Sequence, residues 1–202
     1  MDRLLVLVNG LPGAGKTTVG SRLARTLTAR FLSKDAIKEA LASCLGNATD
    51  VPQLGGIAMD TVWALTQTIP GDVVIDSWWF KPRDLAFVRA GSRTPWPPAS
   101  WRSGATCPAP VAKARYVSRR RADFYQDQQR LAADWDHWAE PLGLAPIVVV
   151  DAARTVDHID LAERVTLAAD SPGPPILHKK PGVSTPHLPT PMTVPTPKPR
   201  HS

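Results

Sequence analysis

Apolar residues in the first part of the chain form short continuous runs that alternate with helical stripes. The runs at 4–8 and 73–75 consist of Leu, Val and Ile, which is typical of strands buried on both faces of a sheet. After the first run, Val19, Leu23 and Leu27 recur every four residues while arginines take the other faces, as expected for a helix packed on a sheet. This alternation predicts an α/β protein with a parallel sheet.

The same periodicity predicts two further helices. One follows Asp35 and has Ile37, Leu41 and Leu45 along one side. The last apolar run, PIVVVD, is typical of a buried strand and ends at Asp151. The helix predicted after it carries an apolar pattern at Ile159, Leu161, Val165 and Leu167.

The stretch between Ala90 and Val111 breaks the alternation. A strand is needed there, but "GSRTPWPPASWRSGATCPAP" contains five prolines and no β-type pattern, and because proline removes ladder donors we expect no strand. One hypothesis is that residues 91–109 are frameshifted: with a suitable choice of third bases, the neighbouring frame of Trp101 to Pro108 spells EVWCDVP. The alternative is a genuine Pro-rich surface insertion, and the coding DNA distinguishes the two.

Composition divides the chain into a folded part, residues 1–170, and a tail, residues 171–202. The folded part is long enough for one sizeable core. The tail holds ten of the 21 prolines, four Lys and Arg, and no Asp or Glu, so it is predicted to be disordered. Without it, 20 Lys and Arg face 18 Asp and Glu, and the basic pI of the chain gives little reason to expect nucleic-acid binding.

The cysteines and the first apolar run bear on the cell compartment. Cys44 and Cys107 form neither a disulfide framework nor a metal-ligand cluster, which fits a reducing cytoplasm. The first apolar run is five residues long and follows Asp2, so it is too short for a signal peptide or a membrane span. We therefore expect a cytoplasmic protein without a membrane partner; its oligomeric state is left open.

The clearest motif is GLPGAGKT, which follows the first strand and fits G-x-x-x-x-G-K-[ST]. Its glycines allow backbone N–H groups to converge on an anion at the positive end of the following helix. Lys16 is expected to reach the β- and γ-phosphates, and the Thr17 hydroxyl to ligate Mg²⁺. The motif predicts ATP or GTP binding by Gly10, Pro12, Gly13, Ala14, Gly15, Lys16, Thr17 and Thr18.

Two carboxylates follow predicted strands near this loop. Asp35 stands at a helix start, where Asp is commonly an N-cap, but also at the sheet edge where ligands of open α/β sheets bind. Asp76 ends the run at 73–75, where it either helps Thr17 to hold Mg²⁺ as a Walker B acid does or simply ends the strand.

A basic helical segment is predicted from Lys113 to Leu142, with arginines one turn or less apart at 115 and 119–121. Such a cluster is usually a solvated face, but on a mobile flap of a phosphoryl transferase it neutralises the transferring phosphate. The turn after the last strand, which contains Arg154, lies at the predicted loop edge and either borders the adenine or is a plain connection.

Five segments, "VNGLPGAGKTT", "LSKDAIKEAL", "VVIDS", "ARYVSRRR" and "VVVDAARTVD", in this order and spacing resemble the small kinase-like P-loop ATP-binding proteins. That neighbourhood includes zeta toxins, chloramphenicol phosphotransferase and gluconate kinase, and the resemblance covers roughly residues 3–168. It implies a P-loop domain with five parallel strands flanked by helices, which uses ATP and passes its γ-phosphate to a hydroxyl of a small molecule. It also implies that Asp35 lies near the acceptor and takes its proton, and that the lid carries Arg115, Arg119 and Arg121.

The resemblance favours a Mg²⁺-dependent kinase in which Lys16 and Asp35 are catalytic. Two other classes stay open: a nucleotide-binding regulator or NTPase that makes no phosphorylated product, and a disabled paralogue. The acceptor is not readable from the sequence, since antibiotic, sugar, nucleoside and peptidoglycan-precursor hydroxyls all fit. Tryptophan is usually a core residue, so Trp63, Trp78 and Trp79 are expected in the core more than in an acceptor pocket.

Overall fold

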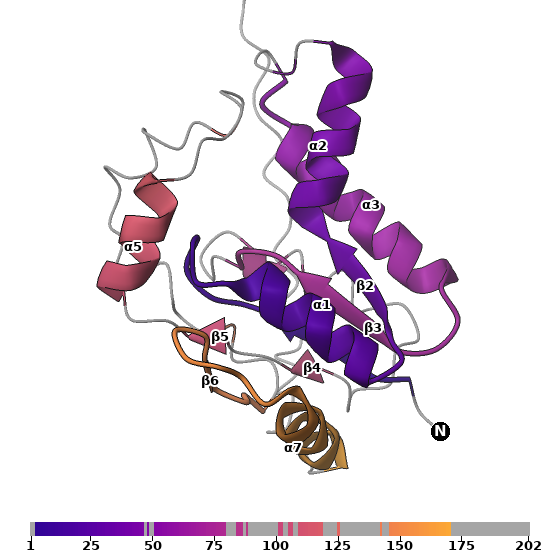
Figure 1. Ribbon diagram of the computed structural model, residues 1–202. Helices are drawn as coiled ribbons and strands as arrows, with labels where there is room; N and C mark the ends of the chain where they lie inside the picture. Colours follow the sequence, from indigo (N-terminus) through magenta and orange to yellow (C-terminus); the bar gives the residue numbers. More distant parts are fainter. Residues whose placement is uncertain are drawn as a thin grey trace, which may run out of the picture.

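The computed structural model describes most of the first 170 residues, namely 3–46, 48, 51–79, 84–86, 88, 101–102, 105–106, 109–118, 125, 142 and 146–170. The helices are α1 (Lys16–Thr26), α2 (Lys34–Leu45), α3 (Leu54–Thr68), α5 (Ala109–Val117) and α7 (His158–Asp170). The strands are β1 (Leu5–Val8), β2 (Arg30–Ser33), β3 (Val73–Asp76), β4 (Trp101–Arg102), β5 (Ala105–Thr106) and β6 (Val150–Asp151). Helices and strands thus alternate along the first part of the chain, as predicted (Figure 1).

All strand pairings in this part of the chain are parallel. One sheet has the order β2-β3-β1-β4 and a second pairs β5 with β6. β3 is the shared neighbour, since its last residue, Asp76, pairs with Val8 of β1 and with Ser33 of β2. Because the carboxyl ends of parallel strands meet at one edge, the segments that follow β1, β2 and β3 begin side by side.

β1 and β3 are buried on both faces, which explains why these two strands are continuous apolar runs. Val6, Val8 and Val74 pack on one side in a cluster with residues of α1 and α7. Leu7 and Ile75 point to the other side, where their cluster includes residues of α3. Figure 1 shows α1 and α3 against the same strands, with α2 standing beside α3 and projecting beyond the sheet.

The expectation that no strand forms between Ala90 and Val111 is wrong. β4 pairs with β1, and β5, which is separated from β4 by two residues, pairs with β6, so residues 101–102 and 105–106 each adjoin a strand. The physical reason is that this hexapeptide, WRSGAT, contains no proline, and parallel pairing uses backbone groups that any other residue supplies. The prolines fall before and after it.

The buried face of α2 differs from the predicted stripe. Leu45 is 51% exposed, whereas Lys38 and Ala42 are buried. The N-cap is Ser33, whose hydroxyl accepts from the Ala36 amide at 3.4 Å, so the interpretation of Asp35 as the N-cap is wrong. Asp35 lies instead in the first turn of the helix.

The apolar pattern of α7 is confirmed in part. Leu161 and Val165 are buried against α1, but Ile159 and Leu167 are each more than 60% exposed. Leu161 and Val165 are one turn apart and therefore share a face of the helix. Ile159 and Leu167 are each two residues from this pair, so they point toward the opposite side.

Several predictions concern residues outside the described part of the chain. They include the tail 171–202, residues 91–100 of the proline-rich stretch, and Arg119 to Arg121 of the basic segment. Among the described helices, none is long and apolar enough to cross a membrane.

Candidate functional site

The loop between β1 and α1 has the backbone that its glycines predict. Gly13 and Gly15 have φ of 85° and 84°, a left-handed conformation that glycine adopts without strain. Gly15 is also the N-cap of α1, so this helix end has no side-chain cap, and its first turn holds no acidic residue. An anion suits a helix start of this kind, because its backbone N–H groups and its partial positive charge both favour a negative ligand.

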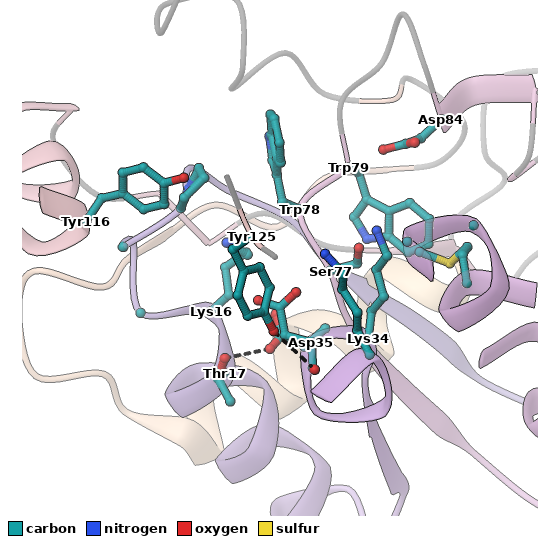
Figure 2. Close-up of a pocket in the computed structure, with 18 of the residues that line it drawn as sticks. Lys16, Thr17, Lys34, Asp35, Ser77, Trp78, Trp79, Asp84, Tyr116 and Tyr125 are labelled. Atoms are coloured by element: carbon teal, nitrogen blue, oxygen red, sulfur yellow. Dashed lines mark hydrogen bonds between the residues drawn. The ribbon is translucent and has the colours of Figure 1, made fainter. Parts of the chain in front are cut away.

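The side chains of the loop motif converge on the end of β3. The Lys16 ammonium donates to the Leu11 carbonyl at 3.0 Å, which folds the side chain back over the loop. The Thr17 hydroxyl donates to Asp76 Oδ2 at 2.6 Å, although the two residues are far apart in sequence (Figure 2). The sequence predicted this pair of oxygens as the magnesium site.

The donor set of that pair suits Mg²⁺. A hydroxyl and a carboxylate are hard oxygen ligands, and Mg²⁺ usually takes one or two protein oxygens and completes its shell with water and phosphate. Asp76 is only 4% exposed, and a carboxylate so deeply buried is favoured beside a cation. In the described residues there is no cluster of three His, Cys, Asp or Glu side chains that would form a metal cage of its own.

Sequence reasoning missed Asn9, which ties the loop to the chain after β3. Its Oδ1 accepts from the amides of Gly10 at 2.7 Å and Trp79 at 3.0 Å, and its Nδ2 donates to the Trp79 carbonyl at 3.3 Å. The only signal was an Asn–Gly pair directly after a strand. These contacts fix the entry of the loop against the segment that follows Asp76.

One cavity of about 330 Å³ joins the loop to the start of α2. Pro12, Gly13, Gly15, Lys16 and Thr17 line it from the loop side, whereas Gly10, Ala14 and Thr18 of the predicted set do not. Lys34, Asp35 and Lys38 line it from α2, and Asp76, Ser77, Trp78 and Trp79 from the end of β3. The structure therefore brings Lys16, Thr17, Asp76 and Asp35 together around one cavity, as predicted (Figure 2).

The tryptophans only partly follow the expectation that they lie in the core. Trp79 is fully buried and packs against Trp63 with ring centroids 6.1 Å apart, as core residues do. Trp78 and Trp79 nevertheless line the cavity. Their position directly after a strand that ends in a candidate site acid was the signal that would have placed them there.

A tyrosine from the predicted basic segment closes on the start of α2. Tyr125 is 3% exposed and lines the cavity, and its hydroxyl donates to Glu39 Oε1 at 2.9 Å. The same hydroxyl lies 3.4 Å from the main-chain oxygen of Asp35, and the Lys38 ammonium lies 4.5 Å from the centre of the ring. The tyrosine thus contacts the first two turns of α2 and was not predicted.

Helix α5 and the turn after β6 meet the loop at its glycines. A Cβ on Gly13 would run into the backbone of Ala112 and Tyr116 in α5, so this glycine permits close packing of the helix. A Cβ at Gly15 would lie 3.6 Å from Ala152 Cβ and 4.0 Å from Arg115 Nη1. The predicted positions of Arg115 and of this turn beside the loop agree with the structure.

Arg154, also predicted at the nucleotide, lies on the turn after β6. Its side chain is 86% exposed and its Nε is 3.4 Å from Asp151 Oδ2. It is not among the residues that line the cavity.

Comparisons with known proteins support this architecture. Residues 5–94 match the profile of a family described as AAA domain. No curated protein matches the sequence.

Solved structures extend the similarity beyond the profile. A protein from Chloroflexus aurantiacus J-10-fl, provisionally named a kinase, is 21% identical, with a TM-score of 0.65 over 83% of this chain and 99% of that one. Shikimate kinase from Acinetobacter baumannii and a gluconokinase from Sinorhizobium meliloti 1021 are each 17% identical, with TM-scores of 0.51. They cover 81% and 82% of this chain and 91% of their own. The chain therefore has the P-loop kinase-like α/β fold, a parallel sheet flanked by helices, as the sequence resemblance predicted.

Proposed function

We propose that the protein is an ATP-dependent phosphotransferase that passes the γ-phosphate of ATP to a hydroxyl group of a small molecule. One observation carries the proposal: a single cavity is lined both by the phosphate-loop residues Lys16 and Thr17 and by Asp35 of α2. A donor phosphate at the loop and an acceptor hydroxyl at the carboxylate would then share one cavity. Positioning of this kind supplies much of the rate enhancement in phosphoryl transfer.

The donor side would hold the triphosphate by charge and backbone amides. The uncapped first turn of α1 faces the phosphates, and Lys16 moves from the Leu11 carbonyl to the β- and γ-phosphates. Thr17 and Asp76 would hold Mg²⁺, which supplies positive charge that offsets the charge developing on the phosphate oxygens. Arg115, together with Arg119 and Arg121, is proposed to add charge from the lid, and Arg154 to border the adenine.

The acceptor side would deliver the hydroxyl in line with the γ-phosphorus. The acceptor oxygen forms a bond to this phosphorus while the bond to the β–γ bridging oxygen breaks, and ADP leaves. The hydroxyl proton passes to the Asp35 carboxylate, which is exposed at the cavity wall. Two structures with the same fold bear the names of kinases of small molecules, shikimate and gluconate, which supports an acceptor of that size.

Two substitutions test the proposal. Lys16→Ala is expected to abolish transfer because it removes the cation that holds the β- and γ-phosphates. Asp35→Asn is expected to leave nucleotide affinity unchanged and to lower transfer by about 10²–10⁴-fold, the usual effect of losing a general base. Calorimetric titration with ATP and Mg²⁺ measures the nucleotide affinity of each variant. Labelled ATP with a panel of hydroxyl acceptors measures phosphate transfer.

The same assays discriminate the other classes. Undiminished turnover in Asp35→Asn contradicts its role as base. Phosphate release that depends on ATP alone and is unchanged by every acceptor identifies an NTPase. A melting temperature that does not respond to ATP and Mg²⁺ identifies a protein without nucleotide binding.

A further inference from the structure

The cavity wall opposite the phosphate loop is rich in hydrogen-bond donors. Lys34 and Lys38 lie one turn apart on α2, and residues at this spacing share a helix face. Both line the cavity, and Lys38 is only 8% exposed. The cation–π contact with Tyr125 fixes the Lys38 ammonium at the cavity wall.

An anion in the cavity would lower the electrostatic cost of placing these two lysines near the helix start. The N-terminal end of a helix carries partial positive charge, so cations in its first turns are destabilising. α2 nevertheless begins with Lys34 and buries Lys38 one turn later, with Asp35 as the acid of its first turn. A negatively charged group in the cavity would be attracted by both ammonium groups and by the helix end at once.

Two buried side chains beside these lysines point to the same kind of ligand. Ser77 is 5% exposed and Trp79 is fully buried, and both line the cavity. In the described part of the chain, neither Ser77 Oγ nor Trp79 Nε1 has a hydrogen-bond partner. The indole N–H is a donor only and the hydroxyl is able to donate, so a ligand oxygen satisfies both.

The carboxylates that line the cavity suit a ligand that carries a hydroxyl group as well as an anionic group. Figure 2 shows Asp35 on the side of Lys16 and Thr17, and Asp84 beyond Trp79, away from Asp35. A hydroxyl donor suits Asp35, and an anionic group suits the two lysines.

We propose that the phosphate acceptor is a hydroxylated organic anion, whose carboxylate or phosphate group binds Lys34 and Lys38 while its hydroxyl faces Asp35. The inference rests on the proposed kinase function and narrows its acceptor. Asp35 and the two lysines lie within about one turn of α2 and line one cavity, so the hydroxyl and the anionic group would belong to one small molecule, such as a hydroxy acid or a sugar phosphate.

Matched neutral and anionic ligands test this inference on the full chain. The loop is first occupied with Mg²⁺ and a non-hydrolysable ATP analogue, so that added anions meet only the remaining part of the cavity. Calorimetric titrations then compare glucose with glucuronate and glucose 6-phosphate, glycerol with glycerate and glycerol 3-phosphate, and acetate with inorganic phosphate. Binding of anions and not of their neutral partners is expected, and the preferred member of each set distinguishes carboxylate from phosphate.

Charge variants link binding to the two lysines. Lys34→Met and Lys38→Met are each expected to weaken anion binding by about tenfold or more, the usual effect of losing a hydrogen bond to a charged group. Lys34→Arg retains the charge and is expected to restore most of the affinity. Arg25→Met removes an exposed cation in the last turn of α1 and serves as the matched control, with affinity unchanged. Thermal unfolding of each variant separates loss of binding from loss of fold.

The outcomes distinguish the two proposals. Equal binding of neutral and anionic partners, no binding of any anion at millimolar concentration, or unchanged affinity in the lysine variants overturns the inference. Lysine-dependent binding without phosphate transfer to any bound anion supports the anion site and contradicts the kinase function. Transfer to a neutral acceptor at the same rate in Lys34→Met as in the wild type supports the kinase function and contradicts the anion site.

Discussion

At the scale of single residues, the sequence predicted the phosphate loop because the motif is local: the glycines, lysine and threonine that it requires lie within eight positions. Thr17 and Asp76 were also predicted as a pair, since strand ends of a parallel sheet meet at one edge. Asn9 and Tyr125 were not, because their partners lie about 70 and 90 residues away and no motif links them. The contacts of a polar side chain with distant backbone depend on the packed fold.

Gly13 has both a conformational and a steric requirement, and Gly46 allows the two to be separated. Gly46 also has positive φ, at 71°, but nothing lies within 4 Å of the position of its missing Cβ. Gly46→Ala is expected to cost about 1–3 kcal/mol of unfolding free energy, because a positive φ is strained for a residue with a Cβ. Gly13→Ala is expected to cost more and to weaken ATP binding, because α5 must move off the loop. Urea unfolding and nucleotide titration measure both; equal effects would contradict the packing argument.

Tyr125→Phe removes one hydroxyl and keeps the ring beneath Lys38. We expect the KM of the acceptor to rise more than that of ATP, because the hydroxyl contacts Glu39 and the turn that carries Asp35. In a double-mutant cycle with Glu39→Gln, the coupling free energy is expected to be about 0.5–1.5 kcal/mol. Additive effects of the two substitutions show that the hydrogen bond does not stabilise the protein.

At the scale of elements, the runs of apolar residues located β1, β3 and the last strand, but helix faces were less reliable. Ile159 and Leu167 belong to the apolar residues of α7 and yet face away from α1. Periodicity identifies a helix, but the width of its buried face depends on how the neighbouring helix crosses it. α3 was not foreseen, since its two early glycines are poor helix formers and its stability comes from packing on the sheet.

The α7 helix begins with a histidine whose environment makes its packing sensitive to pH. Burial is the main cause that lowers the pKa of His158 below its ordinary value of 6.5; the charge of Arg22 lowers it further, and Asp157 opposes the shift. The folded protein therefore favours the neutral imidazole. Its contribution to stability is complete above pH 6.5 and is lost as the pH falls below 6.5 toward the lowered pKa, because the unfolded chain binds the proton more readily.

This pH dependence is tested by substituting the histidine. Thermal unfolding of the wild type and of His158→Gln, followed from pH 8 to pH 5, is expected to show a smaller loss of stability in the variant at the acid end. His187→Gln, in the predicted tail, is the control and is expected to follow the wild type. Parallel curves for His158→Gln and the wild type would show that this histidine does not contribute.

At the scale of the whole molecule, composition explains why the chain is basic and predicts that the folded part ends near residue 170. The charge of the tail accounts for most of the excess of Lys and Arg over Asp and Glu. The chemical class of the acceptor could not be predicted from the sequence, because composition does not show which side chains line a cavity. Lys34 and Lys38 became candidates only when the fold placed them on the wall that contains Asp35.

Removal of residues 171–202 is expected to leave the melting temperature and the ATP affinity unchanged, because a segment of this composition buries little apolar surface. Differential scanning calorimetry and nucleotide titration of the shortened chain measure both. A clear loss of either shows that the tail packs on the folded part.

The last strand, β6, is joined to its neighbour β5 by few paired residues. β1 and β3 share four residue pairs, whereas β4 contributes two to β1, and β5 contributes two to β6. Ladders this short open more readily than long ones, so the amides around 150–151 should exchange with deuterium sooner than those of 73–76. Such openings would carry the turn at Ala152 away from Gly15 while the pairing of β1 with β3 stays closed, and would uncover the phosphate loop from that side.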